Sequence, residues 1–204
     1  VGLTVGKLVF DIPMLGSLHP IDDLWLAQAR RDFPQIATLP APHTVLLIGG
    51  PSKHVAPDND DFTRLLMQLA EHARAEGGCF SAVASRRTPP DWREALDRIA
   101  ADLPGIRWRD DRDGDNPYAG LLGYASRIVC TPDSVNMLSE AAATLAPVFV
   151  WSAERASGRL RMFLDALRAR GRIRDRDDVL ADFAAEPLRE TARVAAEVRR
   201  CLSL

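Results

Sequence analysis

The hydrophobic and polar positions alternate between two patterns from Thr44 onward. Short apolar runs indicate strands, and longer segments with apolar residues three or four positions apart indicate amphipathic helices. The expected strands are Val45 to Gly49, Cys79 to Ala84, Ile106 to Arg109, Ile128 to Thr131 and Val148 to Trp151. Helices are expected at about 62–73, 92–103, 116–125, 134–145, 158–170 and 187–202. This alternation predicts an α/β fold: a Rossmann-like parallel sheet with helices on both faces.

The first 43 residues follow a different pattern, because five prolines divide them into short pieces. Val5 to Ile12 is expected to form one strand and Ile21 to Phe33 one helix, which is not a complete strand-helix-strand set. We therefore divide the chain in two. Residues 1–43 are the end of an N-terminal domain or an extension packed on the main one, and residues 44–204 are a Rossmann-like domain.

Composition narrows the class of protein. With 204 residues, of which 47% are hydrophobic, the chain can bury the core of one domain. The net charge of −2 provides no basic field, so nucleic acid is not expected as a partner. Three cysteines, two of them in apolar runs, fit a reducing compartment, and we predict a cytoplasmic location. The sequence contains no apolar run of transmembrane length and no signal-peptide pattern.

Polar turns follow four of the expected strands. The carboxyl ends of parallel strands lie at one edge of the sheet, so these turns are expected to converge on a ligand there. Glycines permit close approach of a backbone, and hydroxyl and cationic side chains bind phosphate, which together predict an anionic ligand. The candidate ligand-binding residues are Gly49, Gly50, Ser52, Lys53, Ser85, Arg86, Arg87, Thr131, Asp133, Ser134, Asn136 and Glu140.

Each of these turns also has a purely structural interpretation. The double glycine matches no complete phosphate-loop pattern and is also typical of a tight turn. The paired arginines are equally consistent with a solvated turn. His54 is a lone histidine in a loop, and the acidic loop 110–116 fits no calcium-loop spacing. We therefore predict no metal site, and the sequence identifies no catalytic residue.

The helix expected at 134–145 carries three polar residues along one face. Asp133, Asn136 and Glu140 occupy positions i, i+3 and i+7, with mostly apolar residues opposite. Spacing alone favours a solvated stripe, with Asp133 or Ser134 only capping the helix. A ligand role for this face is the alternative.

Several motifs carry a resemblance to a known family. The run Asp133 to Ala141, together with 49–52, 85–88 and Asn116-Pro117-Tyr118, resembles the mitochondrial-fission (elongated-mitochondria) family known from plants. Its bacterial members often carry the label nucleoside-diphosphate-sugar epimerase. The resemblance spans about residue 44 to the C-terminus, and it implies that the chain lacks most of an N-terminal domain.

A more distant similarity is to the C-terminal domain of GT-B glycosyltransferases, through Ser139-Glu140-Ala141 and Pro147. It implies that Glu140 binds the ribose of a nucleotide sugar and that Ser134 lies at the diphosphate. The sequence has neither the Gly-x-Gly-x-x-Gly turn nor the Tyr-x-x-x-Lys pair of redox epimerases, so we exclude redox epimerisation as the leading mechanism.

Two hypotheses of different classes remain. The first is a nucleotide-sugar-binding domain of a GT-B-like glycosyltransferase, with a nucleoside diphosphate as ligand, no cofactor, and catalysis dependent on further chain. The second, implied by the fission resemblance, is a non-catalytic interaction protein that recruits a partner such as a dynamin-related GTPase. The amphipathic C-terminal helix, with Val194, Val198 and Leu202 on one side, could contact such a partner or pack on its own core.

Overall fold

A computed structural model describes residues 2–5, 8–51, 58–175 and 180–202. Its centre is a six-stranded sheet with the order β5-β4-β3-β6-β7-β8, in which every neighbouring pair is parallel. The strands are β3 (His43–Ile48), β4 (Cys79–Ala84), β5 (Arg107–Trp108), β6 (Arg127–Cys130), β7 (Val148–Val150) and β8 (Ile173–Asp175). The predicted α/β fold class is confirmed. β8, which follows the last predicted strand, was not expected.

The order of the strands reverses once. From β3 the chain adds β4 and β5 on one side, and it then returns to add β6, β7 and β8 on the other. Successive connections therefore diverge at the carboxyl ends of β3 and β6, where they leave a crevice. Both strands are buried along their whole length, so this crevice is rooted in the rigid centre of the sheet.

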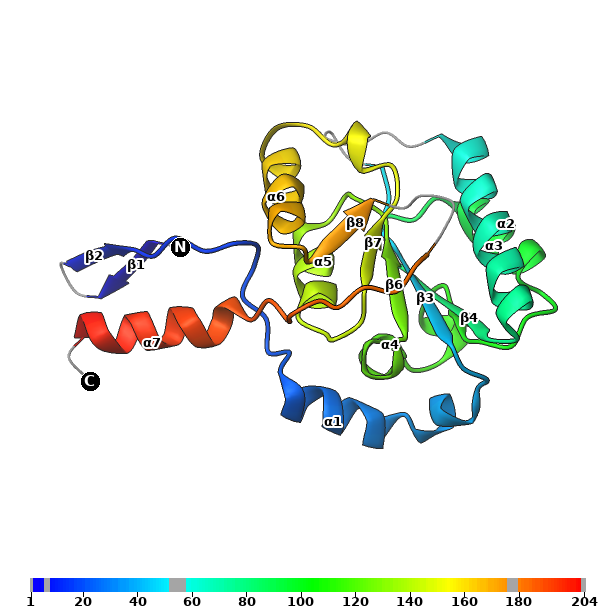
Figure 1. Cartoon of the computed structure of the whole chain (residues 1–204), viewed down its shortest axis with the longest axis horizontal. Coiled ribbons are helices and arrows are strands. Elements are labelled where there is room, and N and C mark those ends of the chain that lie inside the picture. The colour runs from blue at the N-terminus through cyan, green and yellow to red at the C-terminus, as the bar shows by residue number, and fades with distance from the viewer. Residues whose placement is uncertain (1, 6–7, 52–57, 176–179, 203–204) are drawn as a thin grey trace.

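Helices cover both faces of the sheet (Figure 1). Leu46 and Ile48 of β3 pack with α2 (Asn59–Glu76) and α3 (Pro90–Ile99), where Phe62 stacks on Trp92 at 4.0 Å between ring centroids. Val45 and Leu47 belong to the opposite core. That core is covered by α4 (Tyr118–Tyr124), α5 (Val135–Ala142) and α6 (Gly158–Ala169). The alternation along β3 follows from the two-residue period of a strand.

The N-terminal part differs from its expected elements. Instead of one strand over Val5 to Ile12, β1 (Gly2–Val5) and β2 (Leu8–Asp11) form an antiparallel hairpin. Then follow α1 (Asp23–Asp32), capped by Asp22, and a 3-10 helix, η1 (Pro34–Thr38). A Cβ on Gly120 of α4 would lie 2.5 Å from Phe33 Cβ, so α4 and this segment are in close contact. Residues of this segment, including Ile21, Leu26 and Ile36, share the core of the sheet.

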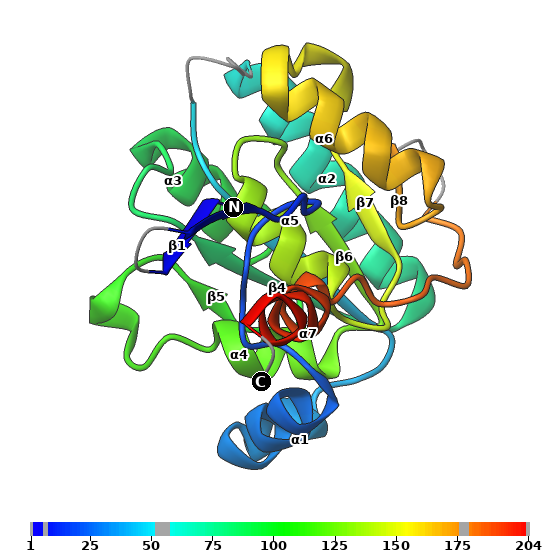
Figure 2. The ribbon, with the colours of Figure 1, turned by 90° about the vertical axis from the view of Figure 1, so that its left-hand side faces the viewer.

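The C-terminal helix α7 (Glu190–Leu202) begins three residues later than predicted and extends from the body on the same side as the hairpin (Figures 1 and 2). Its start is attached to the segment before α1. The Glu190 carboxylate accepts a hydrogen bond from the N–H of Leu15 at 3.1 Å, and Thr191 Oγ1 accepts one from the N–H of His19 at 3.0 Å. The first turn of α7 is thus held against the N-terminal segment by these two hydrogen bonds.

Helix α5 is shorter than the predicted 134–145, and a buried arginine caps its C-terminal end. Arg172 Nε donates to the carbonyl oxygen of Ala142 at 2.7 Å, and Nη2 donates to that of Thr144 at 2.8 Å. Further bonds reach Ala141 and Ala146. Burial lowers the pKa of Arg172 to about 10, so the side chain is still cationic at neutral pH and suits the negative end of the helix dipole.

Candidate functional site

A hydrogen-bonded network joins the two turns at the reversal of strand order. The Gly49 N–H, just after β3, donates to Thr131 Oγ1 at 2.8 Å. The Thr131 hydroxyl donates to Asp133 Oδ1 at 2.6 Å, and the Gly50 N–H donates to Asp133 Oδ2 at 3.0 Å. This network fixes the turn after β3 against the turn after β6, and it forms one wall of the crevice.

Asp133 is the centre of this network. Its side chain is 2% exposed and also accepts a hydrogen bond from Arg87 Nη2 at 2.6 Å, while Arg87 itself is about half exposed. The interpretation of Asp133 as part of a solvated stripe is therefore wrong. Asp133 precedes the first helical residue, Val135, so helical periodicity does not decide where its side chain lies.

The two glycines of the first turn are required by close contacts within the protein. A Cβ on Gly49 would lie 2.0 Å from Asp133 Oδ2, and a Cβ on Gly50 would lie 2.1 Å from the carbonyl oxygen of Arg87. The groups that closely approach these two glycines thus belong to the same chain, and the space beside them is already filled. Their N–H groups donate to Thr131 and Asp133, so an anionic ligand would have to bind through other groups.

Thr88 fixes the turn after β4 to the same place. Its hydroxyl donates to the carbonyl oxygen of Gly49 at 2.6 Å and accepts from the N–H of Ser85 at 2.9 Å. Ser85 Oγ in turn accepts from the N–H of Arg87 at 3.2 Å. The turns after β3, β4 and β6 converge as the sequence predicts.

A pocket of about 260 Å³ lies between these turns and α5. Its apolar part comes from the strand ends and α5, and its polar rim comes from the turns, α4 and α5. The apolar residues are Leu47, Ile48, Val83, Ala84 and Met137, and the others are Gly49, Ser85, Arg87, Asn116, Tyr118, Ser134, Asn136 and Glu140. Small-molecule sites typically measure ~300–1,000 Å³. The pocket therefore has room for a nucleoside-sized group rather than a whole nucleotide sugar.

The first turn of α5 borders this pocket. Ser134 is its N-cap, and its Oγ accepts a hydrogen bond from the Met137 N–H at 3.3 Å. A helix start leaves several N–H groups without an intrahelical acceptor, so those of Val135 and Asn136 are directed beyond the helix. Together with the positive end of the helix dipole they favour an anion at this end of the pocket.

Glu140 and Tyr118 both line the pocket and are joined by a hydrogen bond. The Tyr118 hydroxyl, on α4, donates to Glu140 Oε2, on α5, at 2.5 Å. Burial raises the pKa of Tyr118 well above its usual range, and the negative charge of Glu140 raises it further. Tyr118 is therefore a hydrogen-bond donor at any pH near neutrality. A carboxylate held by one oxygen still offers the other as an acceptor.

His19 lies behind Glu140, in the segment before α1. It is 7% exposed, and burial lowers its pKa, while the nearby charge of Glu140 acts in the opposite direction. The same segment crosses α5 at Ser139, whose Oγ accepts the N–H of Ser17 at 3.0 Å. One side of α5 thus borders the pocket, and another holds the N-terminal segment.

The structure separates the predicted site residues into groups. Those that line the pocket are Gly49, Ser85, Arg87, Ser134, Asn136 and Glu140. Gly50, Thr131 and Asp133 support the wall from behind, whereas Arg86 is exposed and does not line the pocket. Ser52 and Lys53, like His54, lie outside the described residues.

Outside the strands, the list of candidate residues omits three that line the pocket, Asn116, Tyr118 and Met137. The motif Asn116-Pro117-Tyr118 carried part of the family resemblance, which was a signal for the first two. Met137 lies within the run Asp133 to Ala141 that also carried the resemblance, but an apolar residue in a helix is typical of ordinary core and did not by itself indicate a ligand role.

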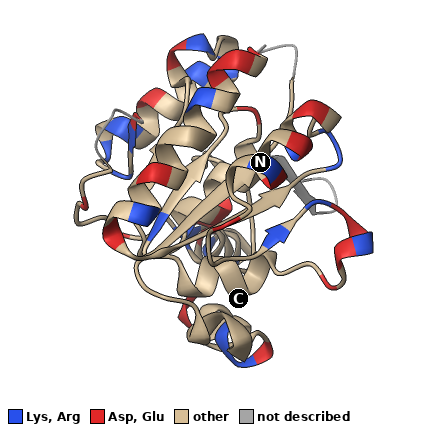
Figure 3. Cartoon of the chain, turned by 90° about the vertical axis from the view of Figure 1, so that its right-hand side faces the viewer, with Lys and Arg blue, Asp and Glu red and all other residues tan. Residues whose placement is uncertain are grey.

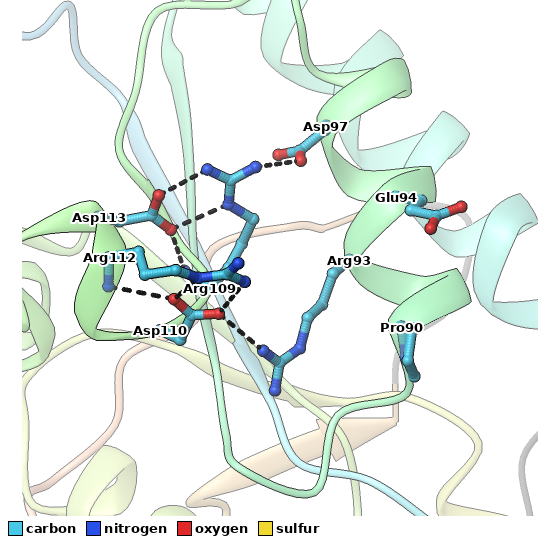
Figure 4. A pocket seen from close by; sticks show the side chains of 8 residues that line it. All are labelled: Pro90, Arg93, Glu94, Asp97, Arg109, Asp110, Arg112 and Asp113. Atoms are coloured by element: carbon cyan, nitrogen blue, oxygen red, sulfur yellow. Dashed lines mark hydrogen bonds and ion pairs between the residues drawn. The ribbon is translucent and has the colours of Figure 1, made fainter.

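A larger cavity, of about 410 Å³, lies between α3 and the loop after β5 (Figure 4). We name it the arginine–aspartate cluster. Arg109 bridges Asp97 and Asp113, and Asp110 binds Arg112 at 2.8 Å and Arg93 at 3.4 Å. Its residues are Arg93, Asp97, Arg109, Asp110, Arg112 and Asp113. All three arginines of the cluster are paired with aspartates, so none of them is free to attract an anionic ligand.

Within residues 2–5, 8–51, 58–175 and 180–202, no group of three or more His, Cys, Asp or Glu side chains is arranged to hold a metal ion. Among the same residues, no helix is both long and apolar enough to cross a membrane. On the side of the molecule opposite α7, acidic and basic residues are interspersed (Figure 3).

The sheet order and the crevice define a parallel α/β protein of the Rossmann-like class, with a small-molecule pocket where the strand order reverses. The family model described as mitochondrial fission ELM1 matches residues 11–202. The chain belongs to this family, and the resemblance seen in the sequence is confirmed.

Two curated relatives illustrate the match. The chain is 30% identical over 193 residues to mitochondrial fission protein ELM1 of Arabidopsis thaliana, over 92% of this chain and 44% of that protein. It is 24% identical over 209 residues to uncharacterized protein RP120 of Rickettsia prowazekii (strain Madrid E), over 98% of this chain and 58% of that protein. The chain thus spans about half the length of the curated relatives it matches.

Likeness to solved structures is weaker. Os79 from O. sativa, in complex with U2F and trichothecene, aligns with 91% of this chain and 41% of its own, at 13% identity and a TM-score of 0.44. A TM-score below 0.5 carries no argument about function. The fold class therefore rests on the strand order and the layers described above.

Proposed function

We propose that this member of the mitochondrial fission ELM1 family binds a nucleoside diphosphate, as part of a nucleotide sugar, in the pocket between β3, β4 and α5. The observation that carries the proposal is the position of Glu140 and the start of α5 together, at the reversal of strand order. This is the place at which parallel α/β sheets bind nucleotides.

The proposal assigns the nucleoside to the pocket itself. Leu47, Val83 and Met137 provide an apolar surface of the kind that suits a base, and Glu140 at the rim provides an acceptor for ribose hydroxyls. The pocket volume of about 260 Å³ supports a nucleoside-sized occupant, with the remainder of the ligand outside.

The diphosphate is assigned to the start of α5. Ser134 and the N–H groups of the first turn supply donors there. Arg87 contributes less than a free arginine would, because Asp133 already neutralises part of its charge. Arg86 is the other cationic residue of the same turn, and it is exposed. Phosphate binding is therefore expected to be weak and to fall as salt concentration rises.

Calorimetric titration with UDP, GDP, ADP and their common sugar conjugates tests the proposal. We expect saturable binding of at least one, and a loss of roughly tenfold or more in affinity for Glu140→Ala, because hydrogen bonds to charged groups contribute ~1.5–3 kcal/mol. Glu94→Ala is the matched control, since Glu94 borders the arginine–aspartate cluster instead. Its affinity should equal that of the wild type.

Absence of binding by the folded chain would overturn the proposal and favour the alternative, a protein that recruits a partner through its surface. Transfer of a sugar is a separate question. The proposal assigns binding to this chain and no catalytic residue, and a cytoplasmic location stays a prediction.

A further inference from the structure

Tyr118 is held in place by its own helix. Its N–H donates to Asn116 Oδ1 at 2.9 Å, which caps the start of α4. Two residues further on, Gly120 packs against Phe33 and Ile36, so α4 cannot shift without disturbing the core. The ring of Tyr118 is packed against the same core, the residue lines the pocket, and its hydroxyl donates to Glu140.

That hydroxyl constrains Glu140. A glutamate side chain on a helix surface has three rotatable bonds, and its carboxylate ordinarily samples many orientations. The 2.5 Å hydrogen bond from Tyr118 holds Oε2 and thereby restricts the orientations that the carboxylate can adopt. Oε1 remains available as an acceptor on a residue that lines the pocket, with fewer orientations than a free carboxylate would have.

We propose that Tyr118 is a positioning residue, which orients Glu140 so that the site selects ribonucleotides over deoxyribonucleotides. This inference rests on the proposed function and deepens it. An oriented Oε1 accepts hydrogen bonds from adjacent ribose hydroxyls, and a ligand without the 2′-hydroxyl leaves part of the hydrogen-bonding capacity of this half-buried acceptor unused. A freely rotating carboxylate would turn toward solvent and discriminate less.

The experiment compares UDP, GDP and ADP with their 2′-deoxy counterparts, in wild type and in Tyr118→Phe, by calorimetry. The wild type should prefer the ribonucleotide by roughly tenfold, the effect of one hydrogen bond to a charged group. Tyr118→Phe removes a single hydroxyl. Its ribonucleotide affinity should fall by a similar factor, and the ratio of ribo to deoxy affinity should approach one.

Tyr124→Phe is the matched control, because Tyr124 is at the other end of α4 and its hydroxyl donates to the carbonyl oxygen of Arg30 at 3.1 Å. Its affinity ratio should stay at the wild-type value. A purely structural role of Tyr118 would lower the melting temperature of Tyr118→Phe and leave the ratio unchanged. The ratio therefore separates positioning from stability.

The possible results distinguish failure of this inference from failure of the proposed function. An unchanged ratio in Tyr118→Phe, or a wild type that binds without ribose preference, overturns this inference and leaves the proposed function intact. A wild type that binds none of the three nucleotides overturns the proposed function and this inference with it. In the Glu140→Gln and Tyr118→Phe double variant, the two losses should be far from additive, because both act through one carboxylate.

Discussion

Two of the cavities in the described part of the chain differ in how far their polar side chains are already paired with each other. The arginine–aspartate cluster is the larger, at about 410 Å³, but Arg93, Arg109 and Arg112 each pair with an aspartate. The pocket at the reversal of strand order measures about 260 Å³. There, Glu140 has one oxygen bound by Tyr118, and the start of α5 presents N–H groups outward.

The difference shows that volume alone does not identify a binding site. Surface ion pairs exchange freely with water and salt, and each contributes little to stability. In the pocket, by contrast, a buried network fixes the wall and leaves defined acceptors and donors at the rim. The relevant property is hydrogen-bonding capacity that the protein holds in position and does not itself use.

The largest effect is expected from Asp133→Ala. This change leaves the Gly50 N–H and the Thr131 hydroxyl without their acceptor. The Asp133 side chain is 2% exposed, so water does not readily replace it. We expect a loss of about 3 kcal/mol in the free energy of unfolding, measured by denaturant titration, because unsatisfied buried donors are costly. Asp110→Ala in the arginine–aspartate cluster should lose much less. Equal losses would remove the distinction between the two regions.

A smaller effect is expected from Thr131→Val, which preserves shape but removes the hydroxyl between Gly49 and Asp133. The free energy of unfolding should fall by about 1–2 kcal/mol, the effect of a buried hydrogen bond lost with its partner left in place. Thr38→Val is the control, since the Thr38 hydroxyl is exposed in η1. No difference between the two variants would mean that the network does not stabilise the wall.

The smallest effect concerns pH and the arginine–aspartate cluster. The hydrogen bond from Arg109 lowers the pKa of Asp113 from 3.8 to about 2. A lowered carboxyl pKa stabilises the folded state above its unfolded pKa, and this stability is lost as the pH falls through about 2.

The melting temperature of wild type should therefore exceed that of Asp113→Asn at pH 4, and the gap should narrow toward pH 2. Differential scanning calorimetry measures both. Asp111→Asn, at an exposed position of the same loop, controls for the general loss of negative charge. A gap that widens on acidification would contradict the assigned pairing.

The sequence predicted the central strands well because β3, β4, β6 and β7 are buried apolar runs. β8 escaped detection because Ile173 is its single buried residue, and Arg174 and Asp175 are exposed at the edge of the sheet. The order of the strands could not be predicted, since periodicity describes each strand alone. The convergence of the turns followed from the parallel class, and their hydrogen-bond partners did not.

Within the site, the sequence pointed to Glu140 but not to the contact that orients it. Tyr118 is 22 residues away in sequence, and only the packing of α4 beside α5 brings the hydroxyl to the carboxylate. Asp133 shows the opposite limit. The helical spacing was applied to Asp133, which lies before the first helical residue, Val135. Its side chain points back into the protein and binds the N–H of Gly50.

The buried Arg172 has a consequence for how the chain comes apart. It immediately precedes β8, and its guanidinium binds four carbonyl groups at the end of α5 and in the loop that follows. Detaching β8 from the sheet would withdraw a cation from the core and expose those carbonyls in the same event. We therefore expect the edge strand β8 and helix α5, which bears Glu140, to unfold locally as one cooperative unit. This unit connects the pocket to the edge of the sheet, although β6 and β7 lie between β3 and β8.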